Sequence, residues 1–400
     1  MEKLIEKYAR KLVEAGYAKA EAPLLGAVDA DLVWNREDQA IPILEKVFAG
    51  LNIQSLLFGR PAEPYRTVVD YLAGEAAGAI FPEDTETRTF CHDLPVASAF
   101  DPQEMIAALK ERKCVIIPER GVVTFGTVSP EQAFITFCSV CFAAFVKFFA
   151  DSLAEVRRGK WDPKREQAFG RAVAGLLEPV KCAPPLAKGP FGDAEAIQEA
   201  MAEAGRATVD CRLVDSYFGN ISLLSGKVLY ISQTGSSLDE LAGCIDAVPL
   251  DGSSCAGMTA SSEFSAHRQI VLYTGKQTVL HGHPPFSVIL SLDCDKRDCP
   301  ERGFCHLRCP EKRSAGGTPI VPGEIGTGRY GLCRTVPPLL QEHRGVIVHG
   351  HGVFTVGGAD FNEAFGALLA IENTSRNEYF NRVGQAFSNP LLTMWDDSLR

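Results

Sequence analysis

The sequence lacks the features that mark membrane, secreted and general nucleic-acid-binding proteins. It has no run of 18 or more apolar residues, so no transmembrane helix is expected. The first residues, MEKLIEKYARKLVEAG, are charged and lack the apolar stretch of a signal peptide. Basic residues are scarce, since Lys and Arg total 40 against 50 Asp and Glu, giving a net charge of −10. This balance argues against a nucleic-acid partner and, with no membrane segment, predicts a cytoplasmic protein.

What remains is the composition of an ordinary globular chain. Hydrophobic residues make up 46% and charged residues 22% of the 400 positions, enough for two or three domains with sizeable cores. The 13 cysteines are an odd and high number. In a reducing cytosol they are expected to be free, buried or metal-bound rather than paired in disulfides.

The chain contains an internal repeat. The segment CVIIPERGVVTFGTVSPEQAF at 114–134 parallels GVIVHGHGVFTVGGADFNEAF at 345–365, with a constant offset of 231 residues. Upstream, LLFGRPAEPYRTVVDYL at 56–72 parallels VLHGHPPFSVILSL at 279–292, and a weaker pair, LVEAG and MAEAG, lies nearer the start of each copy. Three matches in the same order predict a duplicated unit of strand, glycine turn, strand and helix.

The repeat defines the predicted domains: a degenerate copy over 1–156, a linker over 157–192, a full copy over 193–385 and a tail over 386–400. The first copy is the shorter and lacks roughly a strand-rich third of the unit. The predicted fold class is α/β, with tandem α/β/α layered domains around a mostly antiparallel or mixed sheet and the first copy truncated.

In the second copy, turn and capping residues separate the predicted elements. A Ser-Gly-Lys turn joins two strands, and a serine pair followed by a glutamate suits the start of a helix. The predicted elements are a helix over 193–207, strands over 218–224 and 228–232, a helix from Ser261–Ser262, a strand over 277–281 and a helix after Pro284.

The motif HGHP carries the strongest chemical signal. His281 and His283 stand at i and i+2 at the end of a strand, so both side chains point to one side. His351, in VHGHGVF, is a third candidate ligand at a second strand end, although His349 is equally available by spacing. Three neutral imidazoles with an open coordination position match catalytic zinc.

The first copy lacks this set. At the positions of the three histidines it carries Phe58, Arg60 and Arg120. Arginine has no lone pair to offer a metal at ordinary pH, so the first copy is predicted to bind no metal at this site.

Three loops of small and hydroxyl residues precede the histidines: GNIS at 219–222, TGSS at 234–237 and ASSE at 260–263. Such loops can hold a phosphate, although singly they are more often plain turns. Glu263 is a candidate acid/base beside a metal, or alternatively a surface residue of a first helical turn. His267, four residues on and on the same helical face, is interpreted as a packed, hydrogen-bonded histidine rather than a ligand.

Taken in order, GNIS, TGSS, SSE, HGHP and HGHG resemble the class II aldolase/adducin family, whose enzymes include L-fuculose-1-phosphate aldolase, over residues 193–385. The resemblance implies a lyase, dependent on zinc or another divalent metal, that cleaves a carbon–carbon bond of a phosphorylated ketose. It further implies zinc ligands at His281, His283 and His351, a catalytic acid/base at Glu263, and phosphate-binding residues at Gly219, Asn220, Thr234, Gly235, Ser261 and Ser262.

The resemblance leaves alternatives open. An epimerase or decarboxylase could use the same scaffold, but the family's epimerases carry aspartate at the position of Glu263, which favours an aldolase. An adducin-like binding protein is a third hypothesis, against which the intact histidine set argues. The family also implies a homo-oligomer, either a tetramer or a dimer imitating one. A neighbouring subunit's tyrosine would then act as an acid, with Tyr330 and Tyr379 as candidates.

An insertion, DCDKRDCPERGFCHLRCP at 293–310, stands apart from the family pattern. It contains Cys294, Cys299, Cys305 and Cys309. Four cysteines this close suit a second, structural zinc or, less well, an iron–sulfur cluster. Their spacing is not the C-x-x-C knuckle, so free thiols or local disulfides are an equal alternative.

Overall fold

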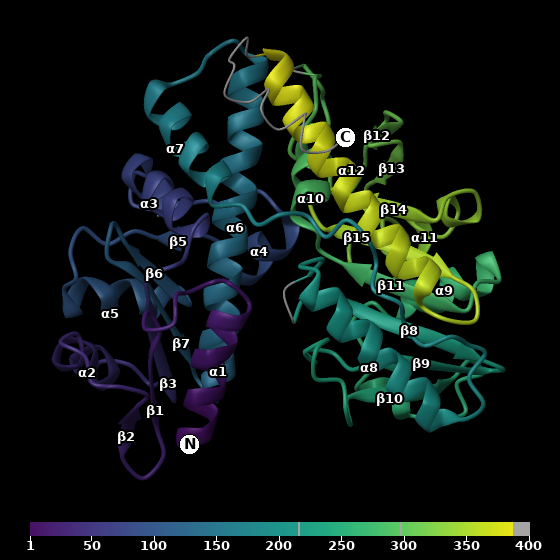
Figure 1. Cartoon of the computed structure of the whole chain (residues 1–400), viewed down its shortest axis with the longest axis horizontal. Coiled ribbons are helices and arrows are strands. Elements are labelled where there is room, and N and C mark those ends of the chain that lie inside the picture. The colour runs from purple at the N-terminus through teal and green to yellow at the C-terminus, as the bar shows by residue number, and fades with distance from the viewer. Residues whose placement is uncertain (215–216, 297, 387–400) are drawn as a thin grey trace. The chain divides into compact units, whose positions relative to one another are not determined.

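The computed structural model describes residues 1–214, 217–296 and 298–386, which form two compact units, Met1–Leu177 and Glu178–Arg400. Each unit contains helices and its own central sheet (Figure 1). The fold class is therefore mixed α/β, as predicted. Of the predicted tail, residues 387–400 lie outside the described part of the chain.

The first unit has a sheet of five strands in the order β2-β1-β3-β7-β6, with every neighbouring pair antiparallel. Its elements are α1 (Glu2–Glu14), β1 (Leu24–Val28), β2 (Leu32–Trp34), α2 (Ile41–Ala49), β3 (Ser55–Gly59), α3 (Tyr65–Glu75), β4 (Ala79–Ile80), α4 (Thr85–Cys91), β5 (Leu94–Pro95), α5 (Pro102–Glu111), β6 (Cys114–Ile117), β7 (Gly121–Gly126), α6 (Pro130–Arg157) and α7 (Pro163–Ala174).

The second unit has a sheet of eight strands in the order β10-β9-β8-β11-β15-β14-β13-β12, mixed because β13 runs parallel to β14. Its elements are α8 (Ala194–Asp210), β8 (Asn220–Ser225), β9 (Val228–Ser232), β10 (Ile245–Pro249), η1 (Ala256–Met258), α9 (Phe264–Thr274), β11 (Thr278–Gly282), α10 (Pro285–Leu292), β12 (Arg313–Ala315), β13 (Thr318–Val321), α11 (Leu332–Thr335), η2 (Leu339–Gln341), β14 (Gly345–Val348), β15 (Gly352–Gly357) and α12 (Asn362–Ala386).

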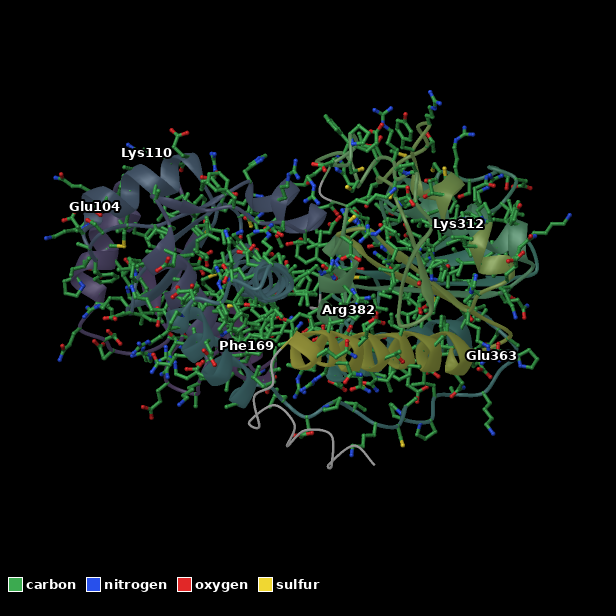
Figure 2. All side chains as sticks on the ribbon, turned by 90° about the horizontal axis from the view of Figure 1, so that it is seen from above. Glu104, Lys110, Phe169, Lys312, Glu363 and Arg382 are labelled. Atoms are coloured by element: carbon green, nitrogen blue, oxygen red, sulfur yellow. The ribbon has the colours of Figure 1, made fainter. Side chains whose placement is uncertain are left out.

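Helices cover both faces of the second sheet. On one face, Ile270 and Val271 of α9 pack with Val279 of β11 and Phe354 of β15 in one apolar cluster. The long helix α12 lies along β15 and β11 and packs against α10, so alternate residues of the same strands are buried beneath it (Figure 1). Figure 2 shows Glu363 and Arg382 towards the two ends of this helix. Because side chains alternate along β11, His281 points to the same side as Val279, the α9 side.

The two sheets share neighbour order and register. The order β2-β1-β3-β7-β6 in the first unit matches β9-β8-β11-β15-β14 in the second. Phe58 pairs with Val123 in the first unit, and His281 pairs with Phe354 in the second. Val123 and Phe354 are therefore equivalent, and they are separated by the offset of 231 found in the sequence. A Cβ on Gly121 would lie 2.4 Å from the Gly59 carbonyl oxygen, and one on Gly352 would lie 2.4 Å from that of Gly282. These shared contacts support the proposed duplication.

Glu119 in the first unit has a strained backbone conformation at a position where the second unit has a glycine. Glu119 has φ 61°, and the position that matches it in the second unit is Gly350, with φ 63°. A side chain in this left-handed region costs about 1 kcal/mol relative to glycine. We therefore expect Glu119→Gly to raise the free energy of unfolding of the first unit by roughly 0.5–1 kcal/mol. Chemical denaturation followed by circular dichroism measures this change.

The control variant is Glu119→Ala, because it removes the exposed carboxylate but keeps the Cβ. It therefore separates the effect of the charge from the effect of the backbone. The backbone N–H of residue 119, which donates to Asp70 Oδ1 at 2.9 Å, is retained in both variants. Equal stabilisation by alanine and glycine would show that the charge, rather than the backbone, is the cause.

Helix α6 has the length and hydropathy of a membrane span, but 78% of its most apolar window is buried inside the protein. It is the central helix of the first unit. Helix α7, in the segment predicted as a linker, packs against it: the Arg165 guanidinium lies over the rings of Tyr71 and Phe148, and Phe169 contacts Phe149. The first unit accordingly continues to Leu177.

Candidate metal centre

Two strand ends bring the three histidines together. His281 is the penultimate residue of strand β11, His283 lies between β11 and α10, and His351 lies just before β15, which pairs with β11. All three side chains are buried. Their ligand atoms lie within 4.8 Å of one another, and within the described ranges this is the single such convergence of three or more His, Cys, Asp or Glu side chains.

The spacing of the imidazoles suits a metal ion. His281 Nε2 lies 3.1 Å from His351 Nε2 and 2.9 Å from His283 Nε2. Nitrogen ligands of a tetrahedral zinc at about 2.0–2.1 Å stand about 3.3 Å apart. His281 Nδ1 donates to the Val353 carbonyl at 3.0 Å, so its Nε2 presents a lone pair to the other two rings. Lone pairs aimed at one point are mutually repulsive unless a cation lies between them, so the donor set fits a divalent metal.

Burial favours the metal-binding form of one of these histidines, His283. Burial lowers the pKa of His283 well below its ordinary value, and the neighbouring His281 and His351 lower it further. A neutral ring is the form that ligates. Gly352 is required for the approach, because a Cβ there would lie 2.8 Å from His281 Cε1 and 2.8 Å from His283 Cδ2.

His349, the alternative ligand by spacing, lies elsewhere. Its Nδ1 is 2.8 Å from the Ser291 carbonyl oxygen and 3.2 Å from Arg313 Nη1. Burial lowers the pKa of His349 to about 4. The structure thus groups His351, and not His349, with the HGHP pair.

Glu263 faces the histidines from the start of α9. The helix begins at Phe264, not at the predicted Ser261–Ser262, and Glu263 precedes it as the N-cap residue without capping it. Its buried carboxylate places Oε1 2.9 Å from His351 Nε2 and Oε2 3.4 Å from His281 Nε2. Burial would raise the pKa of Glu263, but His281, His351 and Asn220 together hold it well below its ordinary value. The surface interpretation of Glu263 is therefore wrong.

Behind Glu263 lies a buried polar chain that sequence reasoning missed. Asn220 Nδ2 donates to Glu263 Oε2 at 2.8 Å, Asn220 Oδ1 contacts His267 Nε2, and His267 Nδ1 lies 2.7 Å from Ser222 Oγ. Burial lowers the pKa of His267 to about 3, so its ring is neutral. The i, i+4 spacing of Glu263 and His267 was the available signal, since it places both on one face of a helix.

The residues predicted to hold phosphate lie in adjoining loops, but their donors are partly committed. The bridge between Gln233 and Ala260 places the turn at 234–235 beside the segment at 261–262. The backbone N–H of Thr234 donates to the Thr259 carbonyl at 2.9 Å, and that of Ser261 to the Ser232 carbonyl at 3.0 Å.

Exposure decides which of these groups a ligand can reach. Thr234, Gly235 and Ser262 are exposed, whereas Ser261 and Asn220 are buried. Gly219, at φ 115°, packs against the His281 carbonyl oxygen, from which a Cβ would be 2.7 Å away. The Asn220 amide nitrogen donates to Glu263 and its oxygen contacts His267, so both polar atoms of this side chain already have protein partners.

The start of α10 fixes the HGHP loop. Glu372, on α12, accepts hydrogen bonds from the backbone N–H groups of Phe286 and Ser287, each at 2.9 Å, and from Ser287 Oγ at 2.8 Å. These are orphan donors of the first helical turn, three residues past His283. Burial raises the pKa of Glu372 to about 7.

The four cysteines of the insertion are not brought together as a metal site. Cys294, Cys299, Cys305 and Cys309 are partly buried and free, and they form no cluster of three or more ligand atoms in the part of the chain that the structure describes. The insertion is held at its base by Arg382, whose Nη1 lies 2.6 Å from Asp293 Oδ2. The predicted second zinc therefore lacks its geometry here.

The two candidate tyrosines differ in accessibility. Tyr379 is fully buried, with its ring centroid 5.4 Å from that of Phe286 and 5.3 Å from that of Phe380. Tyr330 is partly buried in the loop before α11, beside the Arg329 guanidinium. Of the two, Tyr330 is the one that is not fully buried.

Comparisons with known proteins bear on the second unit. Residues 199–379 match the family described as Class II Aldolase and Adducin N-terminal domain. The L-fuculose-1-phosphate aldolase of Thermus thermophilus is similar at 23% identity and TM-score 0.40, covering 48% of this chain and 97% of that one. YgbL of Klebsiella pneumoniae, a putative aldolase/epimerase/decarboxylase, is similar at 22% identity and TM-score 0.37, covering 48% of this chain and 98% of that one. A sugar-phosphate aldolase of Thermotoga maritima is similar at 20% identity and TM-score 0.35, covering 49% of this chain and 97% of that one. A search of curated proteins gives no match.

Proposed function

The domain at residues 199–379 belongs to the class II aldolase and adducin N-terminal domain family, and from this premise we propose that the chain is a metal-dependent lyase that cleaves a carbon–carbon bond of a phosphorylated ketose. The observation that carries the proposal is the buried convergence of His281, His283 and His351 with a carboxylate, Glu263, 2.9 Å from one of them. A purely scaffolding role gives no chemical reason for three buried imidazoles and a buried carboxylate to converge on one point.

The proposed chemistry divides between the metal and the protein. Zinc or another divalent ion, when bound by the three histidines, supplies Lewis-acid stabilisation of the negative charge that develops on the substrate oxygens during cleavage. Glu263 moves the proton at the carbon released by cleavage, because its Oε1 faces the histidines while Asn220 holds Oε2. The hydroxyls of Thr234 and Ser262 and the Gly235 backbone are the proposed phosphate contacts, and they orient the substrate.

Other parts of the proposal rest on the family. Assembly as a homo-oligomer would allow Tyr330 of one subunit to serve the site of another, and a cytoplasmic location remains the prediction of the composition. The first unit, with Phe58, Arg60 and Arg120 in register with the ligands, is proposed to bind no metal and to serve assembly or regulation. An epimerase or a decarboxylase on the same scaffold is the alternative enzyme.

A test that does not require the sugar to be known uses half of the reaction. A ketose 1-phosphate cleaved between C3 and C4 yields dihydroxyacetone phosphate, and a lyase of this type must remove a C3 proton from that product in the reverse direction. We expect the zinc-loaded protein to exchange this hydrogen in D₂O, with loss of its ¹H NMR signal, and to stop when the metal is chelated. Release of dihydroxyacetone phosphate from a panel of ketose 1-phosphates then identifies the substrate.

The outcomes separate the hypotheses. Exchange together with cleavage of any panel member supports the lyase. Interconversion of pentulose 5-phosphates without cleavage would favour an epimerase. A zinc-loaded protein that neither exchanges, cleaves nor epimerises would contradict the lyase and leave a decarboxylase or the non-catalytic binding role as the better account.

A further inference from the structure

We propose that His267 is a positioning residue of this site: together with Ser222 and Asn220 it forms a buried, one-directional chain of hydrogen-bond donors that aims Glu263 at the histidine cluster. This inference rests on the proposed function. His267 lies fully inside the protein, with Ser222 behind it and Asn220 in front.

The direction of the chain follows from its last member. The Asn220 amide nitrogen can only donate, and its Nδ2 lies 2.8 Å from Glu263 Oε2, which accepts. The Asn220 Oδ1 then faces His267 Nε2, which must carry the ring proton to donate to it. A neutral ring with Nε2–H has a bare Nδ1, which accepts from the Ser222 hydroxyl at 2.7 Å.

Two regular elements hold the chain in place. Asn220 and Ser222 stand at i and i+2 on β8, and they pair with His281 and Val279 of β11, so both side chains share the face that carries the metal ligand. His267 lies one turn along α9 from Glu263. Because Asn220 lies on a strand and His267 on a helix, both residues are held in place. The Glu263 carboxylate therefore has one orientation, in which Oε2 is restrained and Oε1 is directed at His351.

The first unit provides an internal comparison. By strand register, Leu24 and Gly26 occupy the positions of Asn220 and Ser222. Their partners on β3, Phe58 and Leu56, match His281 and Val279. The polar chain is therefore missing from the unit that lacks the metal ligands. A purely structural buried network would have no reason to disappear together with the ligands.

The test compares two variants of His267 in the full-length, zinc-loaded protein. His267→Leu removes both hydrogen bonds at similar volume, whereas His267→Gln retains an amide that can accept from Ser222 and donate to Asn220. For hydrogen exchange of dihydroxyacetone phosphate, we expect His267→Leu to lower kcat about 10–100-fold with KM and zinc content little changed. His267→Gln should recover most of that loss. Thr278→Val, which removes a buried hydroxyl bonded to the Asp360 carbonyl at 3.1 Å, is the matched control and should retain wild-type kcat.

Several results would overturn the inference. An unchanged kcat in His267→Leu would do so, as would loss of zinc from it or equal losses in the leucine and glutamine variants, since these indicate packing alone. Independently of any activity, ¹⁵N NMR of histidine-labelled protein should show the Nε2–H tautomer at His267, and an Nδ1–H tautomer would reverse the chain and refute it. Absence of exchange in the wild type would remove the proposed function and the positioning role with it. Exchange in the wild type that is insensitive to His267 would remove the positioning role alone.

Discussion

Replacing Glu263 with glutamine is expected to slow hydrogen exchange of dihydroxyacetone phosphate by about 10³-fold, within the 10²–10⁴-fold range that general acid–base catalysis contributes. Glutamine has the size of glutamate, and its amide oxygen can still accept from Asn220 Nδ2. It cannot take up a proton near neutral pH. The fold and the three imidazoles should be unaffected, so the measurement is the exchange rate at equal zinc content.

A second glutamate tests whether the loss is specific. Glu363 is exposed in the first turn of α12, and Glu363→Gln should leave the exchange rate unchanged. If Glu263→Gln kept more than about a tenth of the wild-type rate with full zinc, a group other than Glu263 would be moving the proton, because that loss falls short of general acid–base catalysis.

The sheet and the pairing of His281 with His283 could be predicted from the sequence because both depend on periodic patterns. The offset of 231 between the repeated segments reappears in strand pairing, because Val123 and Phe354, which are 231 residues apart, pair with Phe58 and His281. Side-chain alternation put His281 and His283 on one side of a strand end. Spacing alone could not choose between His349 and His351, because that choice depends on the turn before β15, which directs one ring to the cluster and the other to Ser291.

The buried polar chain could not be predicted in the same way. Asn220 was a phosphate contact only by the family resemblance, and the interpretation of His267 as a packed, hydrogen-bonded histidine is confirmed by its contacts with Ser222 and Asn220. Neither interpretation joined the two residues to Glu263. In the fold, β8 and the start of α9 meet, and each polar atom must find a partner because burial without one is costly. The Asn220 amide is thereby drawn to Glu263 and His267, an outcome that requires both β8 and α9 to be placed in space.

For the cysteine insertion, the sequence suggested a metal site that the structure does not assemble in the part of the chain that it describes. Four cysteines within sixteen positions are suggestive by composition, but metal binding needs their sulfur atoms to converge on one point. The intervening segment forms turns and contacts of its own, such as the hydrogen bond from the Gly323 N–H to the His306 carbonyl at 2.8 Å. Spacing outside a C-x-x-C knuckle therefore carried little geometric information.

Metal analysis and thermal unfolding give the last prediction, and they test the histidine cluster without any substrate. We expect one zinc per chain in the wild type and none in a His281→Ala/His283→Ala double variant. If zinc binds with a Kd on the order of nanomolar, about 10 µM free zinc stabilises the folded second unit by roughly 5 kcal/mol, because only the folded state presents the three ligands together. Zinc should therefore raise the Tm of the wild type and leave that of the double variant unchanged.

The cysteines and His349 supply the controls for the same measurement. A Cys299→Ser/Cys305→Ser variant and a His349→Ala variant should both keep one zinc per chain, since neither set belongs to the cluster. Two metals per chain in the wild type and one in the histidine double variant would instead support a structural metal site in the cysteine insertion. A wild type that binds no histidine-dependent zinc would contradict the lyase proposal at its foundation. The repulsion between the three facing Nε2 atoms would then have to be relieved by protons rather than by a metal.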